Sequence, residues 1–476
     1  MTQKSYQYTK SSNFTLKYSN EIPEYKYIPM PPPNITGKLH MGHALFLTIQ
    51  DSLTRFYKSC NHTTLWLPGL DHAGLATHEK IIAYQKENSG SYEAASQYIS
   101  STHKEIILKQ IQKMGALPDW DLLTYTMDSD YQEFTLSIIK LLNEDNLIYF
   151  KEGQFYIKLQ DLAKELIEDI NNNIIKILPK TEIGTILHFL ENIEDWCISR
   201  QIPWGAKLPL NENLDFNTSI INEHCLDTWF NSSLWPIACL LKNPELIDKF
   251  YPAQLIETGA DILFFWCARM LMMGNYIHKN QERLNMNIPS KYPFYDIYLH
   301  GLIRDKHNRK FSKSLGNGID PLDMIDKYSA DSLRLFLITR TGPAEDMKFN
   351  ENDLLSYQKF MNKIWQASKF FSIYAEQYGI EKLNSSISFE HEKLKEIELQ
   401  FINYMNKYQF IEAARFIQHE FKSWFCDNWI EENKKSIQEG NIKSIQEGIF
   451  LLEQMLCMLN PFCPFITSDI KHCFFA

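Results

Sequence analysis

The sequence of 476 residues has little glycine and proline, 18 and 19 residues respectively, which excludes a fibrous protein and a long Pro/Gly-rich disordered one. It has no uninterrupted apolar run of the ~18 residues that a membrane helix needs, because Arg269 and Asn275 break the richest stretch, residues 262–277. The first residues show no apolar core of a signal peptide. We therefore expect no membrane association and a cytoplasmic location.

The cysteines lack the spacing of a metal site. There are nine, and no two form a Cys-x-x-Cys pair, so we expect no metal held by the protein and reduced, structural thiols. The net charge of −10 excludes a wholly basic surface. It does not exclude nucleic-acid binding, because phosphates respond to local patches rather than to the total charge.

The order of apolar patterns predicts an α/β region followed by helices. A strand over residues 25–30 stops at three prolines, a helix over 41–58 follows, and a second strand over 63–67 comes next. Strand, loop, helix and strand open a parallel sheet, and such patterns recur until about residue 329. Residues 357–460 then read as long helices with charged outer faces. The predicted fold is α/β, Rossmann-like, with a parallel sheet, followed by an all-α helical bundle.

The first chemical signal is the run of residues 33–43, Pro-Asn-Ile-Thr-Gly-Lys-Leu-His-Met-Gly-His. It delivers His40 and His43 to one face at the start of a helix. A helix N-terminus favours phosphate, and Gly42 lets a ligand approach the backbone closely, so the run indicates a triphosphate site. Two histidines at this spacing also suit metal ligands, but no third ligand is spaced nearby.

The second signal is residues 310–317, Lys-Phe-Ser-Lys-Ser-Leu-Gly-Asn, after a strand that ends at His300. Two lysines flanked by serines in a glycine-bearing loop can fold onto a polyphosphate. Alone, such a loop is usually a solvated turn. The loop indicates a phosphate site only in combination with the histidine run in the other half of the α/β region.

With these two motifs the chain resembles the class I aminoacyl-tRNA synthetases. Residues 40–43 correspond to the HIGH motif and residues 310–314 to the KMSKS motif, and residues 31–44 have the form of the valyl members. The match is collinear over about residues 20–465. Its further blocks are residues 67–77, 195–205, 226–236, 258–272 and 300–335.

The resemblance implies ATP-dependent activation of valine to valyl-adenylate, with Mg²⁺ on the pyrophosphate, and transfer to tRNA(Val). The residues implied in stabilising the phosphoryl transition state are His40, His43, Lys310 and Lys313. Those implied in binding ATP are Thr36, Gly42, Gly259, Asp261, His300, Gly301, Leu302, Ser312 and Ser314. Those implied in binding valine are Pro32, Asn34, Asp71, Trp229, Ile262 and Trp266. Asp71 would pair with the α-ammonium group of valine.

The resemblance also implies a division of the chain. The first half of the catalytic domain would span residues 1–153, a short connector 154–200, the second half 201–350, and a helical anticodon-binding domain 351–476. The family's inserted editing domain is missing at about residues 151–154, and its C-terminal coiled-coil arm is missing as well. We therefore expect no post-transfer editing. We also expect a monomer whose tRNA contacts lie around Lys422, Trp424 and Trp429.

Four positions depart from the family pattern and put the efficiency of the site in question. They are Leu70, His78, Ala206 and Phe311. Two alternative functions stay open. One is a synthetase paralogue that activates an amino acid and delivers it to a non-tRNA acceptor. The other is a non-catalytic RNA-binding relic, which the intact His40, His43 and Lys313 disfavour.

Overall fold

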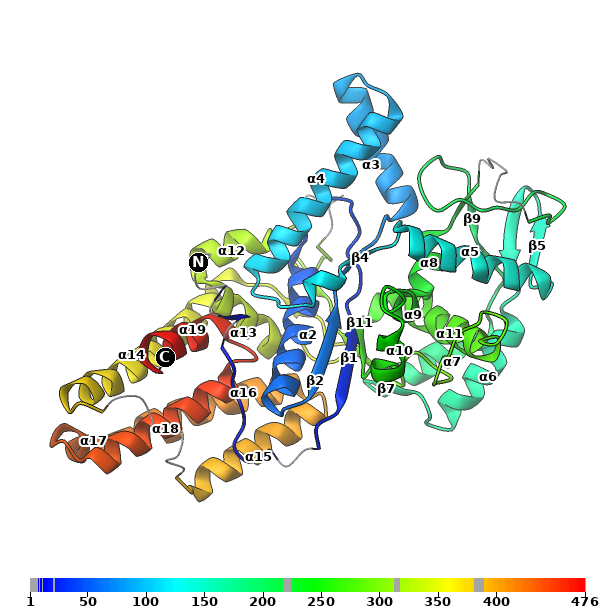
Figure 1. Ribbon diagram of the computed structural model, residues 1–476. Helices are drawn as coiled ribbons and strands as arrows, with labels where there is room; N and C mark the ends of the chain where they lie inside the picture. The colour runs from blue at the N-terminus through cyan, green and yellow to red at the C-terminus, as the bar shows by residue number, and fades with distance from the viewer. Residues whose placement is uncertain are drawn as a thin grey trace.

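The centre of the molecule is a sheet of parallel strands (Figure 1). The computed structural model describes residues 7, 9–10, 12–19, 22–216, 224–311, 317–380 and 389–475. Within these, β1 pairs with β2, and β12 lies between β11 and β7, all in parallel. The backbone N–H of Gln254 donates to the carbonyl of Tyr27 at 2.8 Å, which brings the β11 segment beside β1. The strands are β1 (Tyr25–Pro29), β2 (Thr63–Leu67), β7 (Lys176–Leu178), β11 (Ile256–Gly259) and β12 (Asp296–His300).

The first half surrounds the long buried helix α2 and carries a projecting arm. Helices α3 and α4 pack side by side and extend away from the body (Figure 1). The Tyr84 and Tyr98 rings stack across the two helices with centroids 4.5 Å apart. The elements of this half are α2 (Met41–Ser59), β3 (Gly69–Leu70), α3 (Gly74–Asn88), α4 (Tyr92–Lys113), η1 (Trp120–Leu122), β4 (Thr124–Tyr125) and α5 (Ser129–Glu144).

A tight hairpin joins the first half to the second. Strands β5 (Ile148–Lys151) and β6 (Gln154–Ile157) pair antiparallel, and Glu152 and Gly153 turn the chain with φ of 52° and 77°. Two residues with positive φ are typical of the shortest hairpin turns. The chain therefore passes directly from one half to the other at the position where the family resemblance implies an editing insertion.

The second half returns to the parallel sheet. The helix expected from about Asp261 is interrupted, because a 3₁₀ turn and a π-helical segment precede the regular α-helix. The elements are α6 (Gln160–Asn171), α7 (Glu182–Glu191), β8 (Trp196–Cys197), β9 (Ser199–Arg200), β10 (Cys225–Leu226), α8 (Thr228–Ser233), α9 (Trp235–Ala238), α10 (Glu245–Phe250), η2 (Ala260–Ile262), η3 (Leu263–Ala268), α11 (Arg269–Lys279), β13 (Ile303–Arg304), α12 (Pro321–Tyr328), α13 (Ala330–Arg340) and β14 (Met347–Lys348).

The C-terminal region is helical, as the periodicity predicts. Its elements are η4 (Glu351–Asp353), α14 (Leu354–Gln377), α15 (Glu392–Asn406), α16 (Phe410–Glu420), η5 (Phe421–Ile430), α17 (Glu431–Gln438), α18 (Ile442–Leu459), α19 (Pro464–Ile470) and η6 (Lys471–Phe475). The suggested face around Lys422, Trp424 and Trp429 does not form an exposed patch. Trp429 is buried, and the Lys422 ammonium lies 4.8 Å from the centre of the Phe360 ring.

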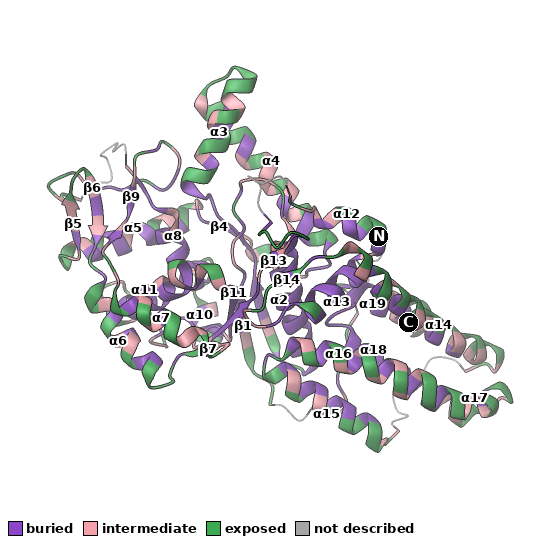
Figure 2. Ribbon diagram, turned by 180° about the vertical axis from the view of Figure 1, so that it is seen from behind, coloured by how far each residue is buried: buried purple, intermediate pink, exposed green. Residues whose placement is uncertain are grey.

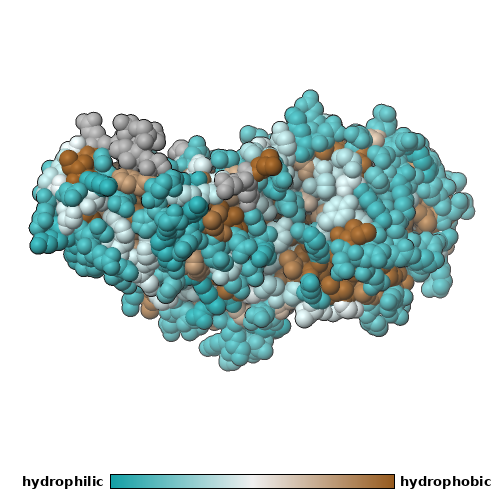
Figure 3. Space-filling model, turned by 90° about the horizontal axis from the view of Figure 1, so that it is seen from below, coloured by the Kyte–Doolittle hydropathy of each residue, from teal (hydrophilic) through white to brown (hydrophobic). Residues whose placement is uncertain are grey.

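The hydrophobic core does not divide at the end of the α/β region. One cluster of buried side chains runs from α2 through α13 into α14, α16 and α18, and a second fills the space around β6, β11 and β12. Figure 2 shows buried residues continuing from α2 to α18. Hydrophilic side chains dominate the face in Figure 3, with small hydrophobic patches between them. No helix within the described residues has the length and apolarity needed to cross a membrane.

Candidate active site

A cavity of about 380 Å³ opens at the carboxyl ends of β1, β11 and β12, where parallel α/β folds place their ligands. The proline loop, the start of α2, the segment after β11 and the segment after β12 each form part of its wall. Its lining residues are Pro31, Pro32, Pro33, Asn34, His40, Gly42, His43, Phe46, Asp71, Trp229, Ser232, Thr258, Gly259, Asp261, Ile262, Trp266, His300, Leu302 and Lys310.

The two motif histidines cap their own helix. His40 is the N-cap residue of α2, and its Nδ1 accepts the backbone N–H of Gly42 at 3.1 Å. The Nδ1 of His43 accepts the backbone N–H of His40 at 3.2 Å, and the two ring centroids lie 4.0 Å apart. A side chain at position 42 would put its Cβ 2.9 Å from the His40 ring, so only glycine fits there. Each imidazole therefore accepts a backbone N–H at the start of α2 and also lines the cavity.

Asp71 supplies a buried negative charge that neutral donors hold. Its carboxylate is 4% exposed, and its hydrogen-bond donors among the described residues are three hydroxyls and one backbone N–H. They are the hydroxyls of Thr228 (2.8 Å), Ser232 (2.6 Å) and Thr126 (3.3 Å) and the backbone N–H of Ala73 (2.9 Å).

In the described part of the chain, the one ionisable group within ion-pair distance of Asp71 is His72, at 3.3 Å. Burial lowers the pKa of His72, so this imidazole stays neutral at neutral pH. The charge of Asp71 is thus left for a cationic group of a ligand.

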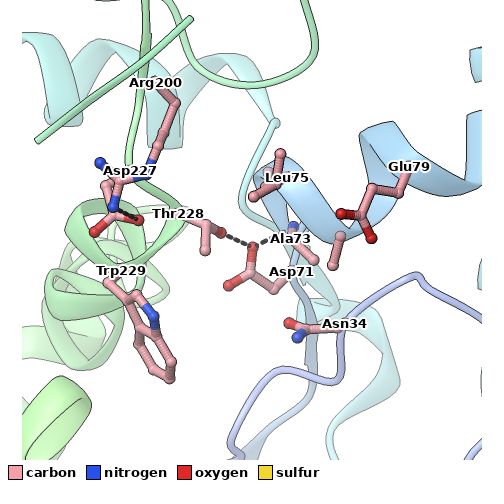
Figure 4. Close-up of a pocket in the computed structure, with 11 residues that line it drawn as sticks. Asn34, Asp71, Ala73, Leu75, Glu79, Arg200, Asp227, Thr228 and Trp229 are labelled. Carbon is pink, nitrogen blue, oxygen red and sulfur yellow. Dashed lines mark hydrogen bonds and ion pairs between the residues drawn. The ribbon is translucent and has the colours of Figure 1, made fainter. Parts of the chain in front are cut away.

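A second cavity of about 370 Å³ adjoins the first, and Figure 4 shows the residues that line it. It shares Asn34, Asp71 and Trp229 with the first cavity. Figure 4 shows Thr228 reaching toward the Asp71 carboxylate, with Asp227 and Arg200 behind it. Arg200 pairs with Asp227 at 3.2 Å, so this guanidinium is already matched by a carboxylate.

Apolar side chains form part of the wall of the first cavity, which Asp71 also lines. This apolar part is built by Pro32, Trp229, Ile262 and Trp266 together with Phe46, which the sequence did not single out. Trp266 belongs to the π-helical η3 and donates its Nε1–H to the carbonyl of Ser232 at 3.0 Å. π-Helical segments are frequent at functional sites, and this one supplies Trp266 to the cavity wall, whereas Ile262 comes from the preceding 3₁₀ turn η2.

The opposite end of the cavity carries charge. Lys310 forms an ion pair with Asp261, and both residues line the cavity. A Cβ on residue 259 would lie 2.6 Å from Asp261 Oδ1 and clash with it, so the glycine leaves room for this carboxylate. Two groups expected to hold ATP are therefore paired with each other in this state.

The structure brings most of the sequence-predicted residues to one cavity, with two exceptions. Thr36 and Gly301 do not line it. Gly301 packs instead against the backbone of Glu345, where a Cβ would come within 1.8 Å of the carbonyl oxygen. The predicted residues Ser312, Lys313 and Ser314 lie outside the described residues.

The departures from the family pattern, Leu70, His78, Ala206 and Phe311, line neither of the two cavities. Leu70 and Ala206 are buried, and His78 bonds to the Tyr92 hydroxyl at 2.7 Å, which ties α3 to α4. The residues that sequence reasoning missed are Pro31, Pro33, Phe46, Ser232 and Thr258. Helical spacing offered a signal for two of them, since Phe46 follows His43 by three residues and Ser232 follows Thr228 by four.

Comparison with known proteins agrees with this geometry. The family profile described as "tRNA synthetases class I (I, L, M and V)" matches residues 4–153, 143–224 and 217–350, and "Anticodon-binding domain of tRNA ligase" matches residues 391–474. The chain belongs to the class I tRNA synthetases. The predicted fold class and family are thereby confirmed.

Relatives of this synthetase include valine–tRNA ligases. The enzyme of Pseudothermotoga lettingae is 27% identical over 661 residues, covering 93% of this chain and 75% of that protein. The enzyme of Thermotoga maritima is 33% identical over 408 residues, covering 81% of this chain but only 44% of that protein. Because 661 positions exceed the 476 residues of this chain, the first relative carries insertions that this synthetase lacks.

Solved structures show the same fold at low identity. An Agrobacterium radiobacter LeuRS–tRNA–LeuAMS ternary complex superposes with a TM-score of 0.74 at 14% identity, covering 98% of this chain and 87% of that one. Mycobacterium tuberculosis methionyl-tRNA synthetase with methionyl-adenylate gives a TM-score of 0.71 at 15% identity, covering 94% and 93%.

The side chains that the structure describes offer no group of three or more His, Cys, Asp or Glu residues placed to hold a metal ion. The Mg²⁺ that the family resemblance implies would come with the phosphates of ATP.

Proposed function

We propose that this synthetase activates valine with ATP and transfers the valyl group to tRNA(Val). The observation that carries the proposal is Asp71, a buried carboxylate that has no lysine or arginine within ion-pair distance among the described residues and lines the same cavity as a group of apolar side chains. An amino acid presents an α-ammonium group beside a side chain. The carboxylate would take the ammonium, and Trp229, Ile262 and Trp266 would surround a short branched aliphatic group such as that of valine.

The remaining cavity suits the phosphates and ribose of ATP. One carboxylate oxygen of valine would attack the α-phosphorus, forming a new O–P bond while the bond to the bridging oxygen breaks and pyrophosphate leaves. His40 and His43 would donate hydrogen bonds to the phosphate oxygens as negative charge grows on them. Lys310 would exchange Asp261 for a phosphate, which frees the Asp261 carboxylate to accept the ribose hydroxyls.

The second cavity would receive the acyl acceptor. Since it shares Asn34, Asp71 and Trp229 with the first, a hydroxyl of the terminal tRNA ribose that enters there would reach the activated carbonyl of valine. The hydroxyl oxygen would bond to the carbonyl carbon, lose its proton, and release AMP. The C-terminal helices, which match an anticodon-binding profile, would hold the far end of the tRNA.

The test is ATP–pyrophosphate exchange by the purified chain with valine, threonine, isoleucine and leucine, followed by charging of a tRNA(Val) transcript. We expect exchange with valine, exclusion of the larger isoleucine and leucine, and charging. Exchange without charging would favour a non-tRNA acceptor. RNA binding without any exchange would leave only a non-catalytic RNA-binding protein.

We further propose that this chain does not edit. A hydrophobic pocket rejects an added hydroxyl only weakly, and the general example of this effect is the valyl-tRNA synthetases themselves, which disfavour threonine by ~10² in their first step. The two-residue turn between β5 and β6 leaves no room at that point for a second, hydrolytic site. We expect measurable formation of Thr-tRNA and no excess ATP consumption with threonine. Rapid hydrolysis of added Thr-tRNA by the purified chain would contradict this.

A further inference from the structure

A buried carboxylate on β11 lies directly behind the candidate active site. Glu257 is fully buried, with 0% exposure, and its neighbours along the strand are buried as well. One of its oxygens bonds to Nδ1 of His300, which lines the cavity. The other accepts the side-chain amide N–H of Gln50 at 2.9 Å. Nothing in the sequence patterns pointed to this residue.

Glu257 belongs to a chain of hydrogen bonds that crosses the sheet. Gln50 lies on α2, and its Oε1 accepts the indole N–H of Trp66 on β2 at 2.9 Å. The network therefore runs from β2 through α2 and β11 to β12, and both carboxylate oxygens have a partner. Among the residues that the structure describes, the ionisable group within ion-pair distance of Glu257 is His300, with no lysine or arginine there.

The contact determines which ring nitrogen of His300 meets the ligand. A carboxylate can only accept, so Nδ1 of His300 carries the proton that joins it to Glu257. The other nitrogen, Nε2, faces Gly259, where a Cβ would lie 3.4 Å away from it. The same Cβ would lie 2.6 Å from Asp261 Oδ1, so Nε2 and that carboxylate flank one point of the cavity wall. His300 is 7% exposed and has little freedom to turn.

We propose that Glu257 is a positioning residue for ATP, which acts by fixing the orientation and the Nδ1–H form of His300 and so presents Nε2 to the nucleotide. The choice of ATP rests on the proposed function. A buried carboxylate carries a large desolvation penalty, which an apolar residue on this strand would avoid, so packing alone does not account for it. With Nδ1–H bonded to Glu257, Nε2 of the ring can accept a hydrogen bond from a hydroxyl or amino group of the nucleotide. Carboxylates orient histidine rings in the same way in metal sites.

The test is a double-mutant cycle of Glu257→Gln and His300→Gln in valine-dependent pyrophosphate exchange. Each single change should raise KM for ATP by about tenfold, the effect of losing a hydrogen bond to a charged or oriented group, and leave KM for valine within about twofold. Because Glu257 acts through His300, adding Glu257→Gln to the His300→Gln variant should raise KM for ATP by less than about twofold more. If Glu257→Gln raised KM for ATP by the same factor in the wild type and in His300→Gln, the proposal would be overturned.

Trp66→Phe is the matched control, because it removes the far hydrogen bond of the same network without touching His300. It should lower the thermal midpoint, as Glu257→Gln does, but leave KM for ATP unchanged. A rise in KM equal to that of Glu257→Gln would reduce Glu257 to a structural role.

A wild-type chain without valine-dependent exchange would refute the proposed function and still leave this inference open to test. The ¹⁵N shifts of labelled histidine, with His300 assigned by its loss in His300→Gln, report the ring directly. We expect a protonated Nδ1 in the wild type and a mixture of ring forms in Glu257→Gln. An unprotonated Nδ1 in the wild type would contradict the proposal.

Discussion

At the scale of the residue, the proposed valine site depends most on Asp71. Three hydroxyls and a backbone N–H keep its carboxylate solvated inside the protein without cancelling its charge. Neutral hydrogen-bond donors stabilise a carboxylate and leave its negative charge in place, whereas a lysine or arginine at the same position would cancel that charge. The residue is therefore prepared for a ligand cation, and its neighbours Thr228 and Ser232 are part of the arrangement.

Asp71→Asn should raise KM for valine by about 10- to 100-fold, because the α-ammonium group loses a charged acceptor. KM for ATP should change little, since the phosphate side of the cavity lies around His40 and Lys310. The measurement is valine-dependent pyrophosphate exchange. Asp161→Asn, at an exposed position of α6, is the control for the same chemical change and should behave as wild type. An unchanged KM for valine in Asp71→Asn would remove Asp71 from the amino-acid site.

Most of the residues that form the site could be identified from the sequence, but their hydrogen-bond and ion-pair partners could not. The motif histidines, Gly259 and Asp261 line the cavity as expected. However, Lys310 is paired with Asp261 and the histidines cap α2, which no linear pattern reports. Glu257 was invisible for a physical reason: a lone glutamate in a strand is usually read as solvent-facing, and only the packing of α2 and β12 on β11 shows that it is buried.

At the scale of the element, two buried carboxylates hold chain segments by their backbone N–H groups. Glu398 on α15 accepts the backbone N–H of Tyr18, and Asp331 on α13 accepts those of Phe465 (3.2 Å) and Ile466 (2.7 Å). Burial raises the pKa of Glu398 to about 7 and that of Asp331 to about 6, although the backbone hydrogen bonds oppose the rise. Both segments are thus fixed by groups that titrate near neutral pH.

Glu398→Gln should flatten the pH dependence of stability between about pH 5 and pH 7. The pKa of Glu398 in the folded protein, about 7, lies above its ordinary value of 4.5, so the folded state binds this proton more tightly than the unfolded state. The contribution of Glu398 is therefore full below pH 4.5, declines as the pH rises, and is lost above about pH 7. Thermal midpoints across this range for the wild type and the variant measure the difference.

In Glu398→Gln, Asp331 should leave a smaller decline that ends near pH 6, because its pKa is raised to about that value. Identical slopes of the two proteins between about pH 6 and pH 7 would show that Glu398 does not titrate there.

Element boundaries set by local chemistry were predicted well, and one set by packing was not. The helix expected over residues 41–58 spans Met41–Ser59, because a capping pair starts it and the chain turns immediately after it. The expected helix from about Asp261 begins instead with 3₁₀ and π segments. A π-helical turn widens the helix by one residue, and the contact of Trp266 with the carbonyl of Ser232 stabilises it from outside the segment.

At the scale of the whole molecule, a buried ion pair connects the site helix α2 to α13, and its arginine also contacts the C-terminal helical region. Arg334 and Asp51 are both 0% exposed and bond at 2.6 Å, and Arg55 holds the same carboxylate at 2.7 Å. Burial would raise the pKa of Asp51, but the two guanidinium groups hold it below its ordinary value. Arg334 also donates to the carbonyl of Pro461 at 2.8 Å. The helical region and α2 therefore belong to one structural unit and not to two independent ones.

Arg334→Met should destabilise the folded chain by about 3–5 kcal/mol, because it leaves the buried Asp51 charge with Arg55 as its one guanidinium partner. Chemical denaturation monitored by circular dichroism gives this value. Lys109→Met, which breaks an exposed pair on α4, is the control and should have no measurable effect. A loss below about 1 kcal/mol for Arg334→Met would mean that this junction does not hold the molecule together.

The sequence by itself determined the elements whose cause is local. Prolines end β1, short apolar runs form the strands, and the two motifs follow strands of a parallel sheet, so their meeting at the carboxyl ends could be expected. The tertiary structure alone decided how the charges are matched. Thr228 and Ser232 reach Asp71 from more than 150 residues away, His300 reaches Glu257 on the neighbouring strand, and Arg334 reaches both α2 and Pro461. Such contacts depend on which side chains share a buried, low-dielectric space, and only the packing of the whole chain sets that.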